Sequence, residues 1–158
     1  MDRDRWDCEV AARYAQVLRG LIAVAGQRQR AEDALHDALV AAMAPGVIES
    51  IDRADAWLYA VAVRKMRRSA WRTRLDAVLD PGTARYPEPS LARVEAIEVL
   101  SLLTPRQREL IVARYFLDMT FADIATHFGI SVGAATSTVS QALARVRRRF
   151  VGGDRGAA

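Results

Sequence analysis

The sequence predicts an all-α protein of two small helical domains joined by a flexible linker, the C-terminal domain carrying a helix-turn-helix. Apolar residues recur at helical spacing through much of the 158-residue chain, and no convincing strand pattern interrupts them. Three of the five prolines fall between Asp80 and Pro89, which is typical of a linker. The expected boundaries are a first domain at 1–75, a linker at 76–92, a second domain at 93–150 and a disordered tail at 151–158.

Three amphipathic helices are expected in the first domain, over about 5–24, 31–43 and 54–75. Gly26 and the polar run after it should separate the first two, and Pro45 with Gly46 should end the second. The apolar stripes expected to face the core in the first two helices comprise Val10, Tyr14, Val17, Leu21, Val24, Leu35, Ala38, Leu39, Ala42 and Met43.

The second domain has two strong helix-start signals and a tight turn. Thr104–Gln107 (TPRQ) places a capping Thr, a Pro at the first helical position and a Gln three residues after the cap. Thr120–Asp123 (TFAD) repeats this pattern with an acidic third residue. In Phe128–Ser131 (FGIS), the Gly can take the left-handed conformation and the Ser can cap a further helix. Helix, short turn and helix in this order predict a helix-turn-helix.

The last helix has a face suited to reading DNA. Its apolar residues from Ala135 to Val146 form one stripe, and small polar residues lie opposite, with arginines towards the end. A recognition helix presents such side chains to base edges, where Gln can pair with adenine, and presents its cations to phosphates. A solvated helix end with arginines near its dipole is the alternative. The predicted DNA-binding residues are Ser131, Gly133, Thr136, Ser137, Ser140, Gln141, Arg145 and Arg148.

A second basic segment, Arg64–Arg74, lies in the third expected helix. It combines cations with Trp71 and contains no acidic residue. This combination is typical of proteins that bind single-stranded or distorted DNA, where bases stack on an aromatic ring. The alternative is a solvated helix whose arginine stems cover apolar surface. The candidate residues are Arg64, Lys65, Arg67, Arg68, Trp71 and Arg72.

Composition and motifs argue against several other classes of function. Cys8 is the only cysteine, so no internal disulfide can form, and a reducing compartment fits. Without a membrane-length apolar run or a signal-peptide pattern, we expect a cytoplasmic protein with no membrane partner. No phosphate loop, nucleophile elbow or paired-carboxylate site occurs, so no catalytic residue, no cofactor and no enzyme activity are expected. Asp33, His36 and Asp37 share a helix face but lack a further ligand, so no metal site is expected.

Several short motifs occur in the order found in one bacterial family. They are Ala31–Leu39 (AEDALHDAL), Ala56–Ala62 (AWLYAVA), Leu103–Glu109 (LTPRQRE), Arg114–Phe116 (RYF), Ile124–Ala125 and Gly129–Gly133 (GISVG). Through these motifs the chain from about Tyr14 to Phe150 resembles an extracytoplasmic-function (ECF, group IV) RNA polymerase sigma factor, a two-domain transcription-initiation subunit.

The resemblance implies a role for each part of the chain. Such a sigma factor directs RNA polymerase core to specific promoters: its helix-turn-helix reads the −35 element, and loop 45–53 with the basic helix recognises and melts the −10 element. The first domain docks on the β′ clamp helices, where Asp33, His36 and Asp37 occupy the matching face. The polymerase β flap, promoter DNA and an anti-sigma factor are the further partners implied.

The chain departs from the family pattern in three places. Val63–Arg64 stand where an Arg-Asn pair is common. His36–Asp37 stand where Gln-Glu is usual, and the recognition helix has Thr136, Thr138, Ser140 and Gln141 where basic residues are common. Losing those cations should weaken non-specific phosphate attraction and shift discrimination towards hydrogen bonding and DNA shape.

Three functions are in competition: a sigma factor, a free-standing helix-turn-helix regulator, and an enzyme acting on nucleic acid, which lacks any acid/base or metal cluster. Against the regulator, the first domain has no evident sensor pocket and carries a second basic helix. A separate question concerns the end of the chain, Ala157 and Ala158, which resembles degradation tags read by Clp-type proteases. The alternative is an uninformative tail in an Ala-rich protein.

Overall fold

The first half of the protein is a unit of three packed helices. The computed structural model describes residues 1–76 and 98–152, and side chains within 1–68 and 98–150. Helices α1 (Arg3–Ala25), α2 (Arg28–Ala42) and α3 (Ala54–Asp76) all contact one another, and a 3-10 turn, η1 (Ile48–Ser50), precedes α3. Their bounds follow the predicted ones closely, except that α2 begins three residues earlier because only Gly26 and Gln27 interrupt the helical path.

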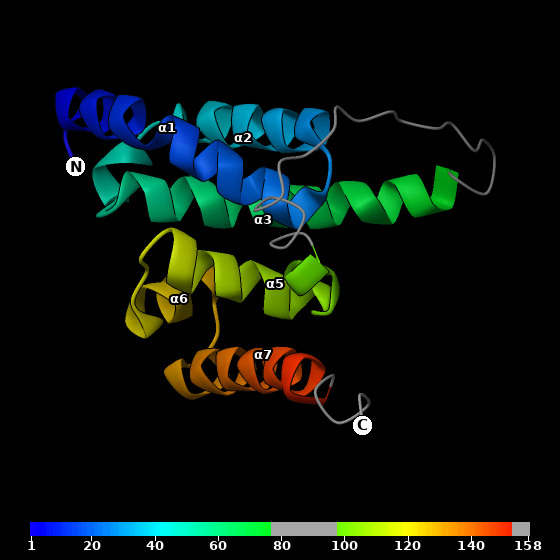
Figure 1. Ribbon diagram of the computed structural model, residues 1–158. Coiled ribbons are helices and arrows are strands. Elements are labelled where there is room, and N and C mark those ends of the chain that lie inside the picture. Colours follow the sequence, from blue (N-terminus) through cyan, green and yellow to red (C-terminus); the bar gives the residue numbers. More distant parts are fainter. Residues whose placement is uncertain (77–97, 153–158) are drawn as a thin grey trace.

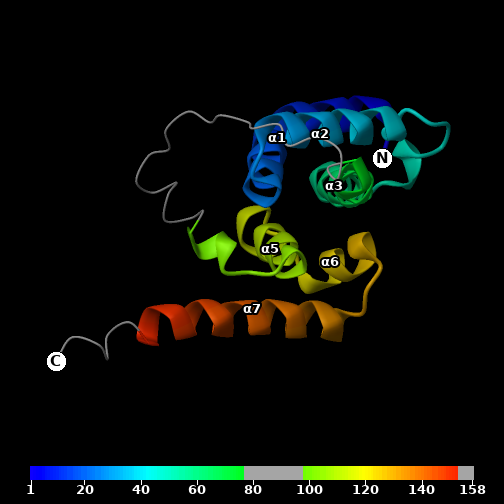
Figure 2. The ribbon, with the colours of Figure 1, turned by 90° about the vertical axis from the view of Figure 1, so that its right-hand side faces the viewer.

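The second half begins with helical residues at 98–101 and continues with α5 (Pro105–Ile111), the π-helical turn η2 (Val112–Phe116), α6 (Phe121–Phe128) and α7 (Val132–Gly152). Both views of the ribbon show layers: α1–α3 on one side, α5 and α6 in the middle, and α7 on the far side (Figures 1 and 2). Within the described residues there is no strand, so the all-α prediction is confirmed. The predicted linker, apart from Asp76, and most of the predicted tail lie outside the described residues.

The core of the first half is formed by buried side chains from all three helices. Trp6, Val17 and Leu21 of α1 are buried, and Leu35 and Tyr59 meet them from α2 and α3. Burial of such large apolar side chains is the main stabilising term of the unit. The sequence pattern did not identify Trp6, which lies one turn before the predicted stripe.

Two residues of the predicted stripes are exposed instead. Tyr14 is 39% exposed because the buried face of α1 is centred on Trp6, Val17 and Gly20, which leaves Tyr14 at its edge. Met43 is 47% exposed because the buried face of α2 is centred on Ala31, Ala38 and Ala42, which leaves Met43 beyond its edge.

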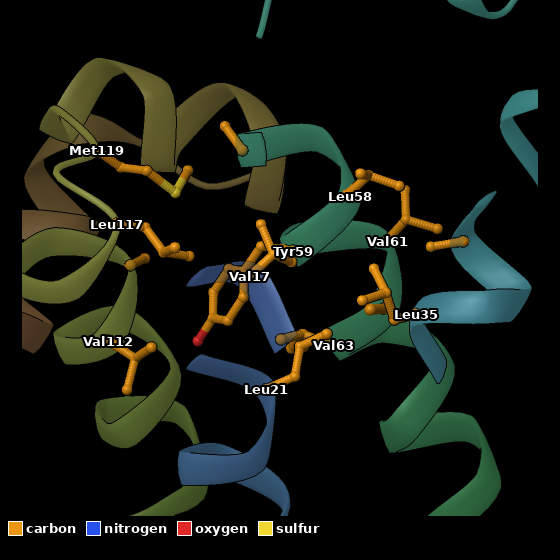
Figure 3. Packing of buried hydrophobic residues seen from close by; sticks show 14 of the residues in the cluster. Val17, Leu21, Leu35, Leu58, Tyr59, Val61, Val63, Val112, Leu117 and Met119 are labelled. Atoms are coloured by element: carbon orange, nitrogen blue, oxygen red, sulfur yellow. The ribbon is translucent and has the colours of Figure 1, made fainter. Parts of the chain in front are cut away.

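The cores of the two halves are continuous. Val112, Leu117 and Met119 from the second half lie against Val17 and Tyr59 from the first, and all belong to one buried cluster (Figure 3). Such contact between segments far apart in sequence requires close approach of their backbones.

Gly20 on α1 provides that close approach. A Cβ at this position would lie 3.1 Å from Val112 Cγ1 and 3.3 Å from Phe116 Cδ1, both of η2. These distances are shorter than ordinary van der Waals contact between carbons, so a larger residue would push η2 away from α1.

None of the helices in the described part of the chain has an apolar stretch long enough to span a bilayer.

We predict that Gly20→Val destabilises the protein by about 1–3 kcal/mol through overpacking, although Val is a better helix former than Gly. Urea unfolding followed by circular dichroism measures this loss. Ala12→Val, on an exposed position of the same helix, should change stability by only a few tenths of a kcal/mol and is the control. Equal effects of the two substitutions would contradict the packing of α1 on η2.

Candidate nucleic-acid interface

The helix-turn-helix is built by the local signals that predicted it. The Thr120 hydroxyl accepts a hydrogen bond from Asp123 N at 3.0 Å, and Asp123 Oδ2 accepts one from Thr120 N at 2.9 Å, which completes a capping box at the start of α6. Gly129 ends α6 with φ of 64°, in the left-handed region. Ser131 then caps α7, its Oγ accepting from Ala134 N at 3.0 Å. These interactions confirm the predicted tight turn.

The helix before this motif is fixed by a second capping box and by an unusual turn. Thr104 and Gln107 exchange the predicted pair of hydrogen bonds at the start of α5. The chain then widens into η2, and Asp118 adopts a left-handed φ of 51°, which is uncommon for a residue other than glycine. Met119 N donates to Ala113 O at 3.0 Å across this turn. Neither η2 nor the Asp118 conformation was predicted from the sequence.

The recognition helix α7 turns its apolar stripe inward. Ala135, Val139 and Ala142 are buried against the other helices of the second half, as predicted, and Leu143 is half-buried. The layer order leaves the opposite face of α7 pointing away from α1–α3 (Figure 2). All eight predicted −35 residues are exposed: Ser131, Gly133, Thr136, Ser137, Ser140, Gln141, Arg145 and Arg148.

The predicted second basic surface, in contrast, partly faces the other half of the protein. Arg64 donates from Nη1 to His127 O at 2.8 Å, and Arg67 forms an ion pair with Glu109 of α5. Lys65 is half-buried and Arg68 is exposed. The backbones of Trp71 and Arg72 belong to α3, but their side chains lie outside those described.

Glu109 is the centre of a buried polar contact between the halves. Its side chain is 4% exposed and accepts from Arg67 Nε at 2.8 Å, while Arg106 Nη1 lies 3.5 Å from Oε2. The Tyr59 hydroxyl donates to the Glu109 carbonyl at 3.0 Å. Burial raises the pKa of Tyr59, so this hydroxyl stays protonated and able to donate.

Arg53 makes a second polar contact between the halves. It donates from Nη1 to Asp123 Oδ2 at 2.8 Å, from Nη2 to Asp55 Oδ2 at 3.0 Å, and from Nη2 to Leu117 O at 3.3 Å. Burial by itself would raise the pKa of Asp123, but hydrogen bonds from Thr120 and the interaction with Arg53 outweigh it and lower that pKa. The ionised carboxylate therefore serves both as the cap of α6 and as the partner of Arg53.

Sequence reasoning missed Tyr59, Arg53 and Glu109. Glu109 stands inside a recognised motif, but nothing in that motif shows which distant cation it meets. The available signal was the apolar pair Val112 and Ala113 one turn later on the same helix face, since a carboxylate on a buried face needs a partner.

The acidic face of α2 is open to solvent. Asp33, His36 and Asp37 are all exposed on this helix, and Gln29 Nε2 donates to Asp33 Oδ1 at 2.9 Å. Within the described residues, no three His, Cys, Asp or Glu side chains gather as a metal site.

Comparison with known proteins agrees with this geometry. The family model described as "Sigma-70, region 4" matches residues 93–146, which contain the helix-turn-helix. The RNA polymerase sigma-E factor of Streptomyces coelicolor is 31% identical over 117 residues, covering 68% of this chain and 63% of its own length. That of Streptomyces avermitilis is 31% identical over 111 residues, covering 64% of this chain and 59% of its own length. The chain thus spans about three fifths of these curated relatives.

Solved structures extend the likeness to the whole fold. The sigma factor RpoE of Bartonella quintana, crystallised with the anti-sigma factor NepR, superposes with a TM-score of 0.72 at 25% identity, covering 96% of this chain and 99% of that one. CnrH, in complex with the cytosolic domain of CnrY, has the same fold at a TM-score of 0.68, with 21% identity and coverage of 96% and 90%.

The second half is therefore a sigma-70 region 4 domain whose recognition helix is exposed. With its sigma-E relatives and the likeness to RpoE, the chain belongs to the extracytoplasmic-function family of RNA polymerase sigma factors.

We predict unequal effects from removing the two partners of the Glu109 ion pair. Arg67→Met leaves a buried carboxylate with only Arg106 nearby and should destabilise by about 3 kcal/mol. Glu109→Gln leaves Arg67, whose side chain is 45% exposed and hydrated, and should cost about 1 kcal/mol.

Urea unfolding measures both losses, with Arg68→Met, at an exposed position of α3, as the matched control. The double variant should be more stable than Arg67→Met alone, because it no longer buries an unpaired charge. Equal losses in the two single variants would contradict the assignment of Glu109 as the buried partner.

Proposed function

We propose that this protein is an alternative sigma factor that directs RNA polymerase core to specific promoters. The observation that carries the proposal is the match to sigma-70 region 4 over a helix-turn-helix whose predicted DNA face is fully exposed. The first half supports it with an acidic surface on α2 and a basic segment in α3, as a subunit with protein and DNA partners requires.

At the −35 element, α7 would enter the major groove. Its N-terminal residues, from Ser131 to Gln141, would contact base edges, as recognition helices do. Arg145 and Arg148, further along the helix, would hold backbone phosphates and supply salt-dependent affinity.

At the −10 element, loop 45–53 and the basic residues of α3 would hold the opened strand. The candidate residues remain Arg64, Lys65, Arg67, Arg68, Trp71 and Arg72. Unstacking a base costs a few kcal/mol, and phosphate contacts and a base pocket must offset it. Because Arg64 and Arg67 bond to the second half in this structure, their use on DNA requires exchange of those contacts for phosphates.

The contact with core polymerase would use the other side of the first half. Asp33, His36 and Asp37 form an exposed polar face on α2 that would bind the β′ clamp helices, and the second domain would contact the β flap. With these partners the protein would act in the cytoplasm. It would have no catalytic role and would need no cofactor.

An anti-sigma factor is a further proposed partner. The two structural relatives were each solved with a bound partner, NepR described as an anti-sigma factor and the cytosolic domain of CnrY. A Clp-type protease acting on Ala157 and Ala158 stays a separate proposal, since both residues lie outside the described part of the chain.

Run-off transcription with purified core polymerase tests the proposal. We expect transcripts that start at defined sites only when this protein is added, and none from core alone. If the protein binds DNA tightly but yields no such transcript with core, the free-standing regulator becomes the better description.

Two substitutions on α7 should separate base reading from phosphate binding. Gln141→Ala should reduce discrimination at one or two base pairs by about 1–3 kcal/mol. Arg148→Ala should weaken binding to all sequences. It should also reduce the slope of the logarithm of the DNA association constant against the logarithm of salt concentration by about the value of one phosphate contact. Binding titrations against matched and mismatched duplexes at several salt concentrations measure both. Identical behaviour of the two variants would contradict the assignment of this face.

A further inference from the structure

The first three turns of the recognition helix carry no charge. From Val132 to Ala144 (VGAATSTVSQALA) there is no Lys, Arg, Asp or Glu. The most frequent base-specific contact in the major groove is an Arg or Lys to guanine, and Asp or Glu can accept from cytosine. This part of α7 can make neither contact, so its specificity must come from other chemistry.

The hydroxyl hydrogens of its two threonines are already used inside the helix. Thr136 Oγ1 donates to Val132 O at 2.9 Å, and Thr138 Oγ1 donates to Ala134 O at 2.8 Å. A threonine hydroxyl has a single hydrogen to donate. What Thr136 still offers a base edge is its methyl group and an oxygen that can only accept.

Apolar groups gather at the end of α7 that follows the tight turn. Val132 is 50% exposed, and the exposed Thr136 lies one turn further on the same side of the helix. Gly133 between them leaves the backbone open, since a Cβ there would meet only Ser131 Oγ, at 4.0 Å. Bases can therefore approach this end of α7 closely.

Only one base of B-DNA presents an apolar group in the major groove, namely thymine through its C5 methyl. We propose that Val132 and Thr136 form a methyl-reading surface that selects thymine at the first positions contacted by α7. This inference rests on the proposed function, in which α7 lies in the major groove, and names the chemistry by which it discriminates.

Replacing thymine by deoxyuridine tests the proposal without altering the protein. Duplexes are first selected from a random pool with the full-length chain, and each thymine in the enriched site is then changed to uracil, which removes one methyl group and keeps every hydrogen-bonding group. We expect affinity to fall about fourfold for each contacted thymine, the value of one buried methyl group.

Two variants at position 136 separate the methyl from the hydroxyl. Thr136→Ser keeps the hydroxyl that can bond to Val132 O but lacks the methyl, so it should bind more weakly and respond less to uracil. Thr136→Val keeps a methyl and lacks the hydroxyl, so it should bind thymine duplexes like the unchanged protein and retain the response to uracil. Val132→Ala should likewise reduce that response.

The outcomes distinguish this inference from the proposed function. If no sequence is enriched from the pool, and no promoter-specific transcript forms with core, the sigma assignment itself fails. If a sequence is enriched and binds equally well with uracil in place of every thymine, methyl reading is overturned and the sigma assignment stands. A loss of binding in Thr136→Val together with an unchanged Thr136→Ser would assign recognition to the hydroxyl instead, and also overturns the inference.

Discussion

The arrangement of this protein depends on one buried carboxylate, that of Glu109, held between the two halves. A buried carboxylate is tolerated only where cations and hydrogen bonds satisfy it. Here Arg67 meets it from α3, and Arg106 lies near it on its own helix, α5. Tyr59 adds a hydrogen bond to the carbonyl of the same residue. The bonds from Arg67 and Tyr59 cross between the halves and are directional, so they select one relative placement of the halves, whereas apolar packing alone would accept several. The consequence is a functional asymmetry: α7 points outward while part of the basic surface of α3 points inward.

This asymmetry bears on how a sigma factor of this shape would engage a promoter. Arg64 binds a main-chain carbonyl and Arg67 a carboxylate, and both acceptors resemble the oxygens of a phosphate in charge or in hydrogen-bonding geometry. The second half thus occupies the places that −10 DNA would take under the proposed function. A phosphate that displaces Glu109 must also leave that carboxylate with another partner, and Arg106 is near enough to provide one. The exchange is therefore more favourable than breaking an isolated buried pair, although the apolar contact at Gly20 must open as well.

Most local features could be predicted from the sequence, because a few neighbouring residues determine them. The capping boxes at Thr104 and Thr120, the left-handed Gly129 and the inward stripe of α7 are of this kind. The contacts Arg53–Asp123 and Arg67–Glu109 were not predictable, because each joins residues more than forty positions apart. The sequence does not indicate which acidic residue pairs with which arginine over such a separation. The prediction that Tyr14 faces the core was wrong for a related reason. The apolar stripe of a helix is wider than the surface that packs, and the neighbouring helices decide where the buried surface ends. The same holds for the candidate sites. The exposure of the −35 residues was predictable from the sequence, whereas the bonds of Arg64 and Arg67 to the second half were not.

Under the proposed function, the uncharged stretch of α7 from Val132 to Ala144 would make a second DNA contact necessary. A methyl contact discriminates by roughly 1 kcal/mol, less than a bidentate Arg–guanine pair, so one short element read in this way gives a small ratio of specific to non-specific binding. The arginines near the end of α7 cannot improve that ratio, because phosphates are the same at every sequence. A second element read by α3, as proposed, would multiply the discrimination, provided that both elements are engaged on one DNA molecule. Because Arg64 and Arg67 of α3 are held by the second half, their proposed contribution to that discrimination would begin only when the halves separate. Under the proposed function, the charge distribution of α7 and the Glu109 contact would therefore act together, since both would make specific binding depend on the simultaneous use of both halves.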